Sequence, residues 1–215
     1  CVRSLHADSL LPTADWGLEH VLQLHGTSTD MAMKQSTLAG ERVLLRPWQD
    51  RDADAFAAMN ADSRVMEFFV APLSRAESDA MLARMRAAAD ERGWGWWCVD
   101  INGECAGFTG LSAPTYETSF TPCIEVGWRF RPQFWGHGYA TEAARLALDY
   151  GFDTLQLQEI VSFAAAGNHR SRRLMERIGY WKAPAFLVER IKVDGQWIDG
   201  PLLGNAYGPW AAEAL

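Results

Sequence analysis

Hydrophobic positions change their spacing several times after about residue 41, and these changes predict alternating strands and helices. Apolar residues that alternate or run together predict strands at 42–46, 94–101, 104–111, 123–130 and 159–165. Apolar residues three or four positions apart predict helices that begin near residues 50 and 74, and two more at 136–152 and 168–178. Two final strands flank Asp194-Gly195, which gives the order β-α-α-β-β-β-α-β-α-β-β.

Residues typical of turns and helix ends support these boundaries. Asn102-Gly103 separates two strands and predicts a tight hairpin, Asp50 is a candidate N-cap, and Ser74 with Glu77 forms a capping-box pattern. A strand, a helix and a second strand follow one another around Gly136, which implies a parallel strand pair in an otherwise antiparallel sheet. The predicted fold class is therefore α+β with a mixed, mostly antiparallel sheet.

The first part of the chain lacks the hydrophobic periodicity of the rest. Residues 1–37 show no sustained hydrophobic period, although 16–24 could form one short helix. The first residue is Cys1, and Met31 and Met33 are candidate natural starts. We expect residues 1–37 to be an N-terminal extension of unknown role and residues 38–215 to form one domain.

Composition narrows the class of protein. With 215 residues, 48% of them hydrophobic, the chain can bury a sizeable core, which excludes intrinsic disorder for most of it. A formal net charge of -7 disfavours nucleic acid or an anionic membrane as the main partner, and charged residues interrupt every hydrophobic run. The 4 cysteines form no CxxC pair, so we expect free thiols in a reducing cytoplasm and no metal site.

The segment Gln133 to Glu142 is the most distinctive, because its two glycines follow a strand and open a helix. Glycines expose successive backbone N–H groups, and a helix N-terminus adds about half a positive charge, so the segment is a candidate anion site. The alternative is an ordinary strand-to-helix turn. The segment matches neither the phosphate-binding loop with Gly-Lys-Ser/Thr nor the dinucleotide fingerprint, which disfavours a nucleotide-triphosphate site.

A second segment, Asn168 to Arg173, places a cluster of positive charge in an acidic protein. Asn168 is a good N-cap and the arginines could form a solvated face, which is the simpler interpretation. The segment follows a strand expected to run parallel to the one before Gln133. Two helix N-termini would therefore open on the same side of the sheet.

Together these segments resemble the GCN5-related N-acetyltransferase (GNAT) superfamily. Gln133-x-x-Gly136-x-Gly138 is similar to its pyrophosphate-binding pattern, and Asn168-x-x-Ser171-x-x-Leu174 with Gly179-Tyr180 is similar to the following β-α unit. The strand at 42–47 and the hairpin at 189–199 resemble the RimJ/RimL-like branch, whose founding members acetylate the N-termini of ribosomal proteins. The resemblance covers about residues 40 to 210.

The resemblance implies that acetyl-CoA lies where the two central parallel strands splay apart. It implies pantetheine bonds to the backbone of Val126, Trp128 and Phe130, and a bond near the thioester from Asn168. Arg172 or a neighbouring arginine would meet phosphates. The predicted pyrophosphate site consists of Gln133, Gly136, His137, Gly138, Tyr139, Ala140 and Thr141.

For catalysis, the resemblance makes Glu125 the candidate base and Ser171 the candidate acid. Glu125 could instead fix local structure by hydrogen bonds, and Ser171 could be an ordinary hydroxyl in a first helical turn. Met175 stands where many members have a tyrosine, and a thioether cannot donate a proton to the leaving thiolate. Tyr116 and Tyr139 are other candidate donors. An acyl-enzyme on Cys123 is disfavoured, because direct transfer is the family's usual course.

The predicted activity is transfer of an acetyl group from acetyl-CoA to a primary amine, either a protein N-terminus or a small amine. The alternative is a non-catalytic acyl-CoA-binding sensor or docking module, which Met175 favours. The acceptor loops should include Met66–Pro72 and Tyr116–Pro122, and the acidic composition favours a cationic acceptor. The cluster Trp94, Trp96 and Trp97 is interpreted as sheet core, and a homodimer is compatible with the sequence.

Overall fold

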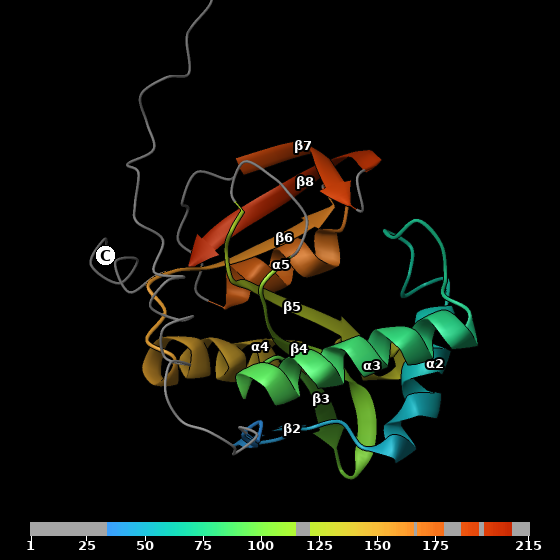
Figure 1. Ribbon diagram of the computed structural model, residues 1–215, viewed down its shortest axis with the longest axis vertical. Helices are drawn as coiled ribbons and strands as arrows, with labels where there is room; N and C mark the ends of the chain where they lie inside the picture. The colour runs from blue at the N-terminus through green and yellow to red at the C-terminus, as the bar shows by residue number, and fades with distance from the viewer. Residues whose placement is uncertain (1–33, 115–120, 166, 179–185, 194–195, 208–215) are drawn as a thin grey trace, which may run out of the picture.

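The computed structural model describes residues 34–114, 121–165, 167–178, 186–193 and 196–207. It contains a single eight-stranded sheet with helices on both faces (Figure 1). The strands are β1 (Leu38–Ala39), β2 (Leu44–Arg46), β3 (Trp96–Ile101), β4 (Glu104–Ser112), β5 (Glu125–Phe130), β6 (Ile160–Ala165), β7 (Phe186–Val193) and β8 (Gln196–Tyr207). The helices are α2 (Ala53–Ala61), α3 (Arg75–Arg92), α4 (Tyr139–Asp149) and α5 (His169–Arg177), with short helical turns at Asp50–Asp52, Pro132–Phe134 and Tyr150–Thr154.

The strand order β1-β2-β3-β4-β5-β6-β8-β7 confirms a mixed, mostly antiparallel sheet. β5 and β6 run parallel, and the other neighbouring strands described are antiparallel. The last strand, β8, lies between β6 and β7, so the closing hairpin extends the sheet beyond β6. The fold class predicted from the hydrophobic pattern is therefore confirmed.

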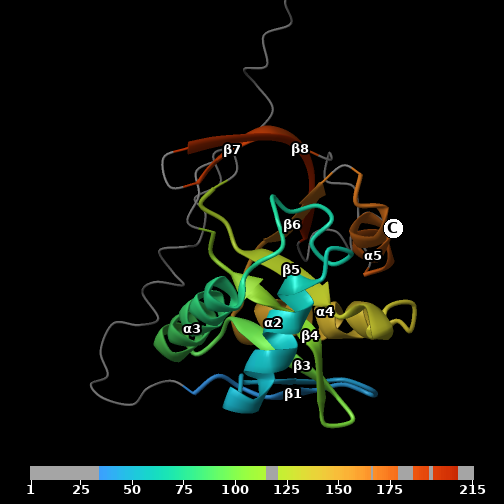
Figure 2. The same cartoon turned by 90° about the vertical axis from the view of Figure 1, so that its right-hand side faces the viewer.

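Two hydrophobic clusters lie on opposite faces of the sheet, because successive side chains of a strand alternate between its faces. On one face side chains of α2 and α3, such as Phe56 and Leu82, pack on strand residues such as Cys98 and Phe108. On the other face the small residues of α4, among them Ala143 and Ala147, let this helix lie close to the strands. Figure 2 shows α3 and α4 on opposite sides of the central strands.

Several local predictions are confirmed. Asn102 and Gly103 both have positive φ (53° and 85°), as the tight hairpin requires. The N–H of Glu77 donates to Ser74 Oγ while the N–H of Ser74 donates to Glu77 Oε2, which completes the capping box. Trp94 and Trp97 are buried in the sheet core, as predicted, whereas Trp96 is partly exposed.

Other boundaries differ from the prediction. Asp50 does not cap α2: Gln49 and Asp52 form the capping box of a 3-10 turn that precedes it. β5 begins at Glu125 rather than at Cys123, and the helix predicted from 136 begins at Tyr139 and ends in a π-helical turn. Tertiary packing decides such ends, and hydrophobic spacing does not record it.

The described residues reach slightly beyond the predicted domain boundary. Gln35 is buried, and the carbonyl of Ser36 accepts a 2.7 Å hydrogen bond from the indole of Trp97. The boundary at residue 38 stays a prediction. Gly179 and the turn at Asp194-Gly195 lie outside the described residues. None of the helices within those residues is long and apolar enough to cross a bilayer.

Candidate active site between β5 and β6

The central parallel strands touch at one end and separate toward the other. Glu125 and Val161 are the one register pair between them within the described residues, and the N–H of Val161 donates to the carbonyl of Ile124 at 2.8 Å. Backbone groups alternate between the two sides of a strand, so those of Val126, Trp128 and Phe130 face β6 as Ile124 does. The splayed strands therefore leave backbone donors and acceptors along β5 that no β6 register pair uses.

One of these groups is used within the protein. The carbonyl of Phe130 accepts a 2.8 Å hydrogen bond from the indole of Trp135, which lies in the loop before α4. This bond fixes the path of the chain from β5 into the glycine segment. The backbone of Val126 and Trp128 is thus better placed than that of Phe130 to bind a ligand in the gap.

The glycine segment has the conformation that its composition predicts. Gly136 and Gly138 both have φ of 82°, where side chains cause strain, and a Cβ at Gly136 would meet nothing within 4 Å. The N–H of Thr141 already donates to the carbonyl of Gly138 at 3.1 Å. The donors open to a ligand are therefore the N–H groups from Gly136 to Ala140, at the positive end of α4.

The contacts that hold this segment in place were not predictable from the local sequence pattern. Glu142, in the first turn of α4, accepts hydrogen bonds from the backbone N–H of Arg42 at 2.7 Å and from its Nε at 2.9 Å. Arg42 also donates from Nη1 to the carbonyl of His137 at 2.9 Å, and its guanidinium lies over the ring of Tyr139. Partial burial would raise the pKa of Glu142, but the hydrogen bonds from Arg42 outweigh it and lower this pKa.

The N-terminus of α5 lies at the other side of the gap, after β6. Asn168 caps the helix, since its Oδ1 accepts from the N–H of Ser171 at 3.1 Å. The hydroxyl of Ser171 accepts a 3.3 Å hydrogen bond from the indole of Trp128. The structure therefore brings Trp128 of β5 and Ser171 of α5 together across the gap.

Three segments meet at Arg170 in the same helical turn. Its guanidinium lies over the ring of Trp135 at 4.3 Å from the centroid, and its Nη2 is 2.9 Å from Glu67 Oε2. Glu67 belongs to the loop between α2 and α3, one of the two predicted acceptor loops. Tyr116 and the rest of residues 115–120, in the other acceptor loop, lie outside the described residues. Arg172 has intermediate exposure in the first turn of α5.

Two carboxylates and a thiol gather where the strands join. Burial, followed by the charges of Glu125 and Glu159, raises the pKa of the Cys123 thiol to about 12. Cys123 is 6% exposed, and a thiol that stays protonated is a poor nucleophile. Burial also raises the pKa of Glu159, which the sequence analysis did not single out as a candidate.

Met175 is 2% exposed and packs in the core. Tyr139, a candidate proton donor, packs against the rings of Phe134 and His137. Met175 thus offers no proton at the gap, whereas Ser171 does carry one. Its contact with Trp128 uses an oxygen lone pair and leaves the hydroxyl hydrogen for another acceptor.

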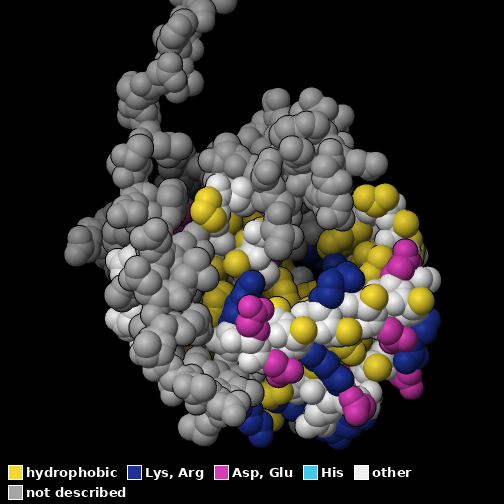
Figure 3. Space-filling model, viewed as in Figure 1, with side chains coloured by type: hydrophobic (Ala, Val, Ile, Leu, Met, Phe, Trp, Pro, Cys, Tyr) yellow, Lys and Arg dark blue, Asp and Glu magenta, His cyan; other side chains and the backbone are white. Residues whose placement is uncertain are grey.

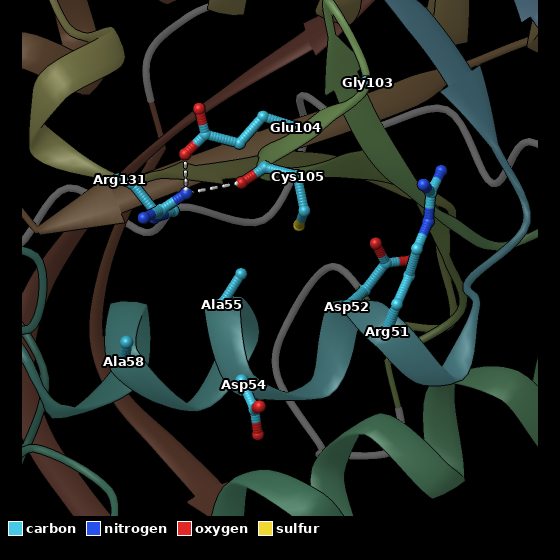
Figure 4. Close-up of a pocket in the computed structure, with 9 residues that line it drawn as sticks. All are labelled: Arg51, Asp52, Asp54, Ala55, Ala58, Gly103, Glu104, Cys105 and Arg131. Carbon is cyan, nitrogen blue, oxygen red and sulfur yellow. Dashed lines mark hydrogen bonds and ion pairs between the residues drawn. The ribbon is translucent and has the colours of Figure 1, made fainter.

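A separate cavity of about 460 Å³ lies between α2 and the β3–β4 hairpin (Figure 4). Arg131 binds Glu104 and the carbonyl of Cys105 on one side, and Ala55 and Ala58 of α2 lie on the other. None of the predicted site residues lines this cavity.

Next to this cavity, donor atoms of Asp52, Cys98 and Cys105 lie within 4.8 Å of one another. Both carboxylate oxygens of Asp52 accept hydrogen bonds from Arg46, at 2.7 and 2.9 Å. A guanidinium at this place repels a cation, so the group is better explained as part of a buried ion pair.

Comparisons with known proteins agree with this geometry. The sequence model of the acetyltransferase (GNAT) domain family matches residues 42–180. The YkkB protein of Bacillus subtilis is 30% identical over 169 residues, which cover 73% of this chain and 96% of YkkB. An FsC-acetyl coenzyme A-N(2)-transacetylase of Aspergillus fumigatus is 31% identical over 159 residues, 71% of this chain and 68% of the enzyme.

Solved structures show the same architecture. An acetyltransferase from Agrobacterium tumefaciens has a TM-score of 0.65 and 27% identity, covering 84% of this chain and 99% of its own. The RimJ protein of Mycobacterium smegmatis, solved in complex with CoA-disulfide, has a TM-score of 0.64 and 21% identity, covering 83% of this chain and 92% of its own. Fold, splayed strands, glycine segment and family match agree, and the chain belongs to the GNAT family of acetyl-CoA-dependent N-acetyltransferases.

Proposed function

We propose that acetyl-CoA binds in the gap between β5 and β6, with its pyrophosphate on the N-terminus of α4. The single register pair between these strands is the observation that carries the proposal, because it leaves backbone groups of β5 available along the gap. The N–H donors from Gly136 to Ala140 and the positive φ of both glycines fit a diphosphate at one end. The CoA-disulfide of the RimJ complex supports the same ligand class.

The joined end of the strands fits the reacting end of the cofactor. Acetyl-CoA supplies an acetyl group activated as a thioester. Glu125 stands where the strands meet and accepts the proton that the attacking amine loses. Ser171 donates its hydroxyl proton to the departing sulfur, and the N–H of Trp128 on its oxygen favours that loss. Asn168 holds the first turn of α5 through the N–H of Ser171.

The resemblance to the RimJ/RimL-like branch supports an N-terminal amine as acceptor, and a small amine is the other candidate. The loop Met66–Pro72 is the acceptor loop, since its Glu67 reaches Arg170 beside the gap. Its apolar members Phe68, Phe69 and Val70 are exposed and available to a substrate.

The direct experiment measures CoA release from acetyl-CoA with a panel of primary amines. Glu125→Gln should lower kcat by about a hundredfold while leaving acetyl-CoA affinity within a factor of two, since general bases contribute ~10²–10⁴. Glu159→Gln is the matched control, because Glu159 also lies beside Cys123. If Glu159→Gln lost the activity and Glu125→Gln kept it, the assignment of the base would be reversed.

Met175 supports one alternative, a protein that binds acyl-CoA without turnover, because its side chain cannot protonate a leaving thiolate. Release of CoA in the presence of an amine distinguishes the enzyme from the binding protein. Acetyl-CoA binding with no CoA release for any amine would favour the alternative, whereas release that Ser171→Ala lowers would favour catalysis.

A further inference from the structure

Arg129 is a cation near the C-terminal end of the central strand β5. Its side chain lies on the α2/α3 face of the sheet, where Nη1 donates a 2.6 Å hydrogen bond to Asn60 Oδ1. Its guanidinium lies 4.3 Å from the ring centroid of Phe69 and 5.3 Å from that of Phe108. Phe69 belongs to the acceptor loop and is 52% exposed, so Arg129 lies under that loop and not in the interior of the core.

The charge of Arg129 has no counter-ion within the part of the chain that the structure describes. Nearby arginines differ: Arg131 pairs with Glu104, and Arg170 pairs with Glu67. Burial lowers the pKa of Arg129 to about 10, so the side chain is still a cation at neutral pH. A partly buried guanidinium with one neutral partner keeps further N–H donors for a bidentate acceptor such as a carboxylate.

Arg129 and the candidate base share one face of β5. Side chains at 125, 127 and 129 point the same way because strand side chains alternate. Gly127 lies between the other two, and a Cβ there would be 2.9 Å from Cη2 of Trp96. The indole of Trp96 therefore forms a floor between Glu125 and Arg129, which lie roughly 13 Å apart along the strand.

The acceptor loop Met66–Pro72 covers Arg129 on the α2/α3 face of the sheet. Phe68, Phe69 and Val70 are its exposed apolar side chains. The loop is at the right of Figure 1, and hydrophobic side chains are visible at the same place in Figure 3. A molecule between this loop and Trp96 would have Glu125 at one end and Arg129 at the other.

We propose that Arg129 binds a carboxylate on the amine acceptor, and that the enzyme acts on amines with a carboxylate on the order of 10 Å away, a separation comparable to that of positions 125 and 129 along the strand. This proposal rests on the proposed function and specifies its acceptor class. A short peptide with a free N-terminus and an acidic third residue has this chemistry. It differs from the cationic acceptor that net charge favours, because a local guanidinium acts within the ~8–10 Å over which salt screens the rest of the protein.

The test compares two peptides, Ala-Ala-Glu-amide and Ala-Ala-Gln-amide, which differ in one carboxylate. We expect wild-type kcat/KM to be about tenfold higher for the acidic peptide, because only its carboxylate can accept charge-assisted hydrogen bonds from the guanidinium. Arg129→Gln should abolish the preference while keeping a donor for Asn60, and Arg129→Lys should retain part of it. Arg84→Gln, at an exposed position of α3, is the matched control and should leave the ratio unchanged.

Peptide binding in the presence of CoA, measured by calorimetry, separates this inference from the proposed function. Tighter binding of the acidic peptide that is lost in Arg129→Gln supports the inference even when no CoA is released, while the absence of release overturns the proposed function. Equal binding and equal turnover of the two peptides, binding of neither, or an unchanged ratio in Arg129→Gln would overturn the inference.

Discussion

Glu142 in the first turn of α4 accepts hydrogen bonds from both the backbone N–H and the guanidinium of Arg42, 100 residues earlier in the chain. The same guanidinium reaches the carbonyl of His137. This pair ties the segment just before β2 to the candidate pyrophosphate segment, although neither side chain belongs to the glycine motif. We interpret both as positioning residues that hold the backbone donors in place.

Replacing Arg42 by Ala should weaken acetyl-CoA binding more than it weakens the fold. The pair is half exposed on the arginine side, so its loss should lower the free energy of unfolding by about 1 kcal/mol or less. The misplaced donors should raise the dissociation constant of acetyl-CoA by about fivefold, which corresponds to about 1 kcal/mol. Calorimetry and urea unfolding measure the two quantities. Unchanged affinity in a folded variant would show that the pair is structural only.

Gly136→Ala tests the pyrophosphate segment with little risk of a steric clash. Gly103→Ala is a matched control, because Gly103 also has a positive φ and open space around its Cβ position but lies in the β3–β4 turn. Both variants should lose roughly 1–2 kcal/mol of stability through backbone strain. Gly136→Ala alone should weaken acetyl-CoA binding, by about tenfold if one or two N–H bonds are lost. Equal affinities of the two variants would place the pyrophosphate elsewhere.

Ser171→Ala should lower kcat by about a hundredfold, the lower end expected of a general acid. Trp128→Phe should have a smaller effect in the same direction, because it removes the indole donor and keeps the hydroxyl. His169→Ala changes an exposed residue of the same turn and serves as the control. Steady-state CoA release at saturating acetyl-CoA measures all three. A full-rate Ser171→Ala enzyme would transfer the role of acid to water or to another residue.

The free energy of unfolding should fall at low pH as the carboxylate of Asp52 is protonated. Burial alone would raise the pKa of Asp52, but hydrogen bonds from Arg46 and from the N–H of Gln49 lower it below its ordinary value. A carboxyl whose folded pKa is depressed stabilises the fold fully above its unfolded pKa, and this contribution is lost as pH falls through the folded value. Urea unfolding should therefore show a constant contribution from pH 7 to 5 and a loss below about pH 4.

Asp52→Asn should remove that acid dependence and lower stability at pH 7 by roughly 3 kcal/mol, the lower end for a broken buried pair, since Arg46 keeps Asp100. Asp79→Asn, in an exposed pair with Arg75, is the control and should change stability by well under 1 kcal/mol. If Asp52→Asn lost stability at low pH as steeply as the wild type, the acid dependence could not be assigned to Asp52.

The hydrophobic pattern predicted most of the sheet because strand alternation and helix spacing are local. It also predicted the parallel pair, since a helix must connect β5 to β6. It missed β1, whose two residues are too few to show a period. It also placed several ends wrongly, such as the start of α4, because packing and capping decide them.

The candidate site likewise contains residues that the local sequence reveals and residues that only the fold reveals. Gly136 and Gly138 were visible because only glycine tolerates their backbone angles without strain. Arg42 with Glu142 was not visible, because contacts between distant segments leave no local spacing. Arg129 did leave a signal, a charge between Trp128 and Phe130 in an apolar strand, and its meaning emerges only with the neighbours that the fold brings to it.

Calorimetric titration of the full chain with acetyl-CoA, and separately with ATP, tests the central claim most directly. We predict saturable binding of acetyl-CoA and no binding of ATP, because the proposed site combines phosphate donors with a gap for the pantetheine arm, which ATP lacks. Binding of ATP as tight as that of acetyl-CoA, or no binding of acetyl-CoA by a folded sample, would contradict a cofactor site between these two strands.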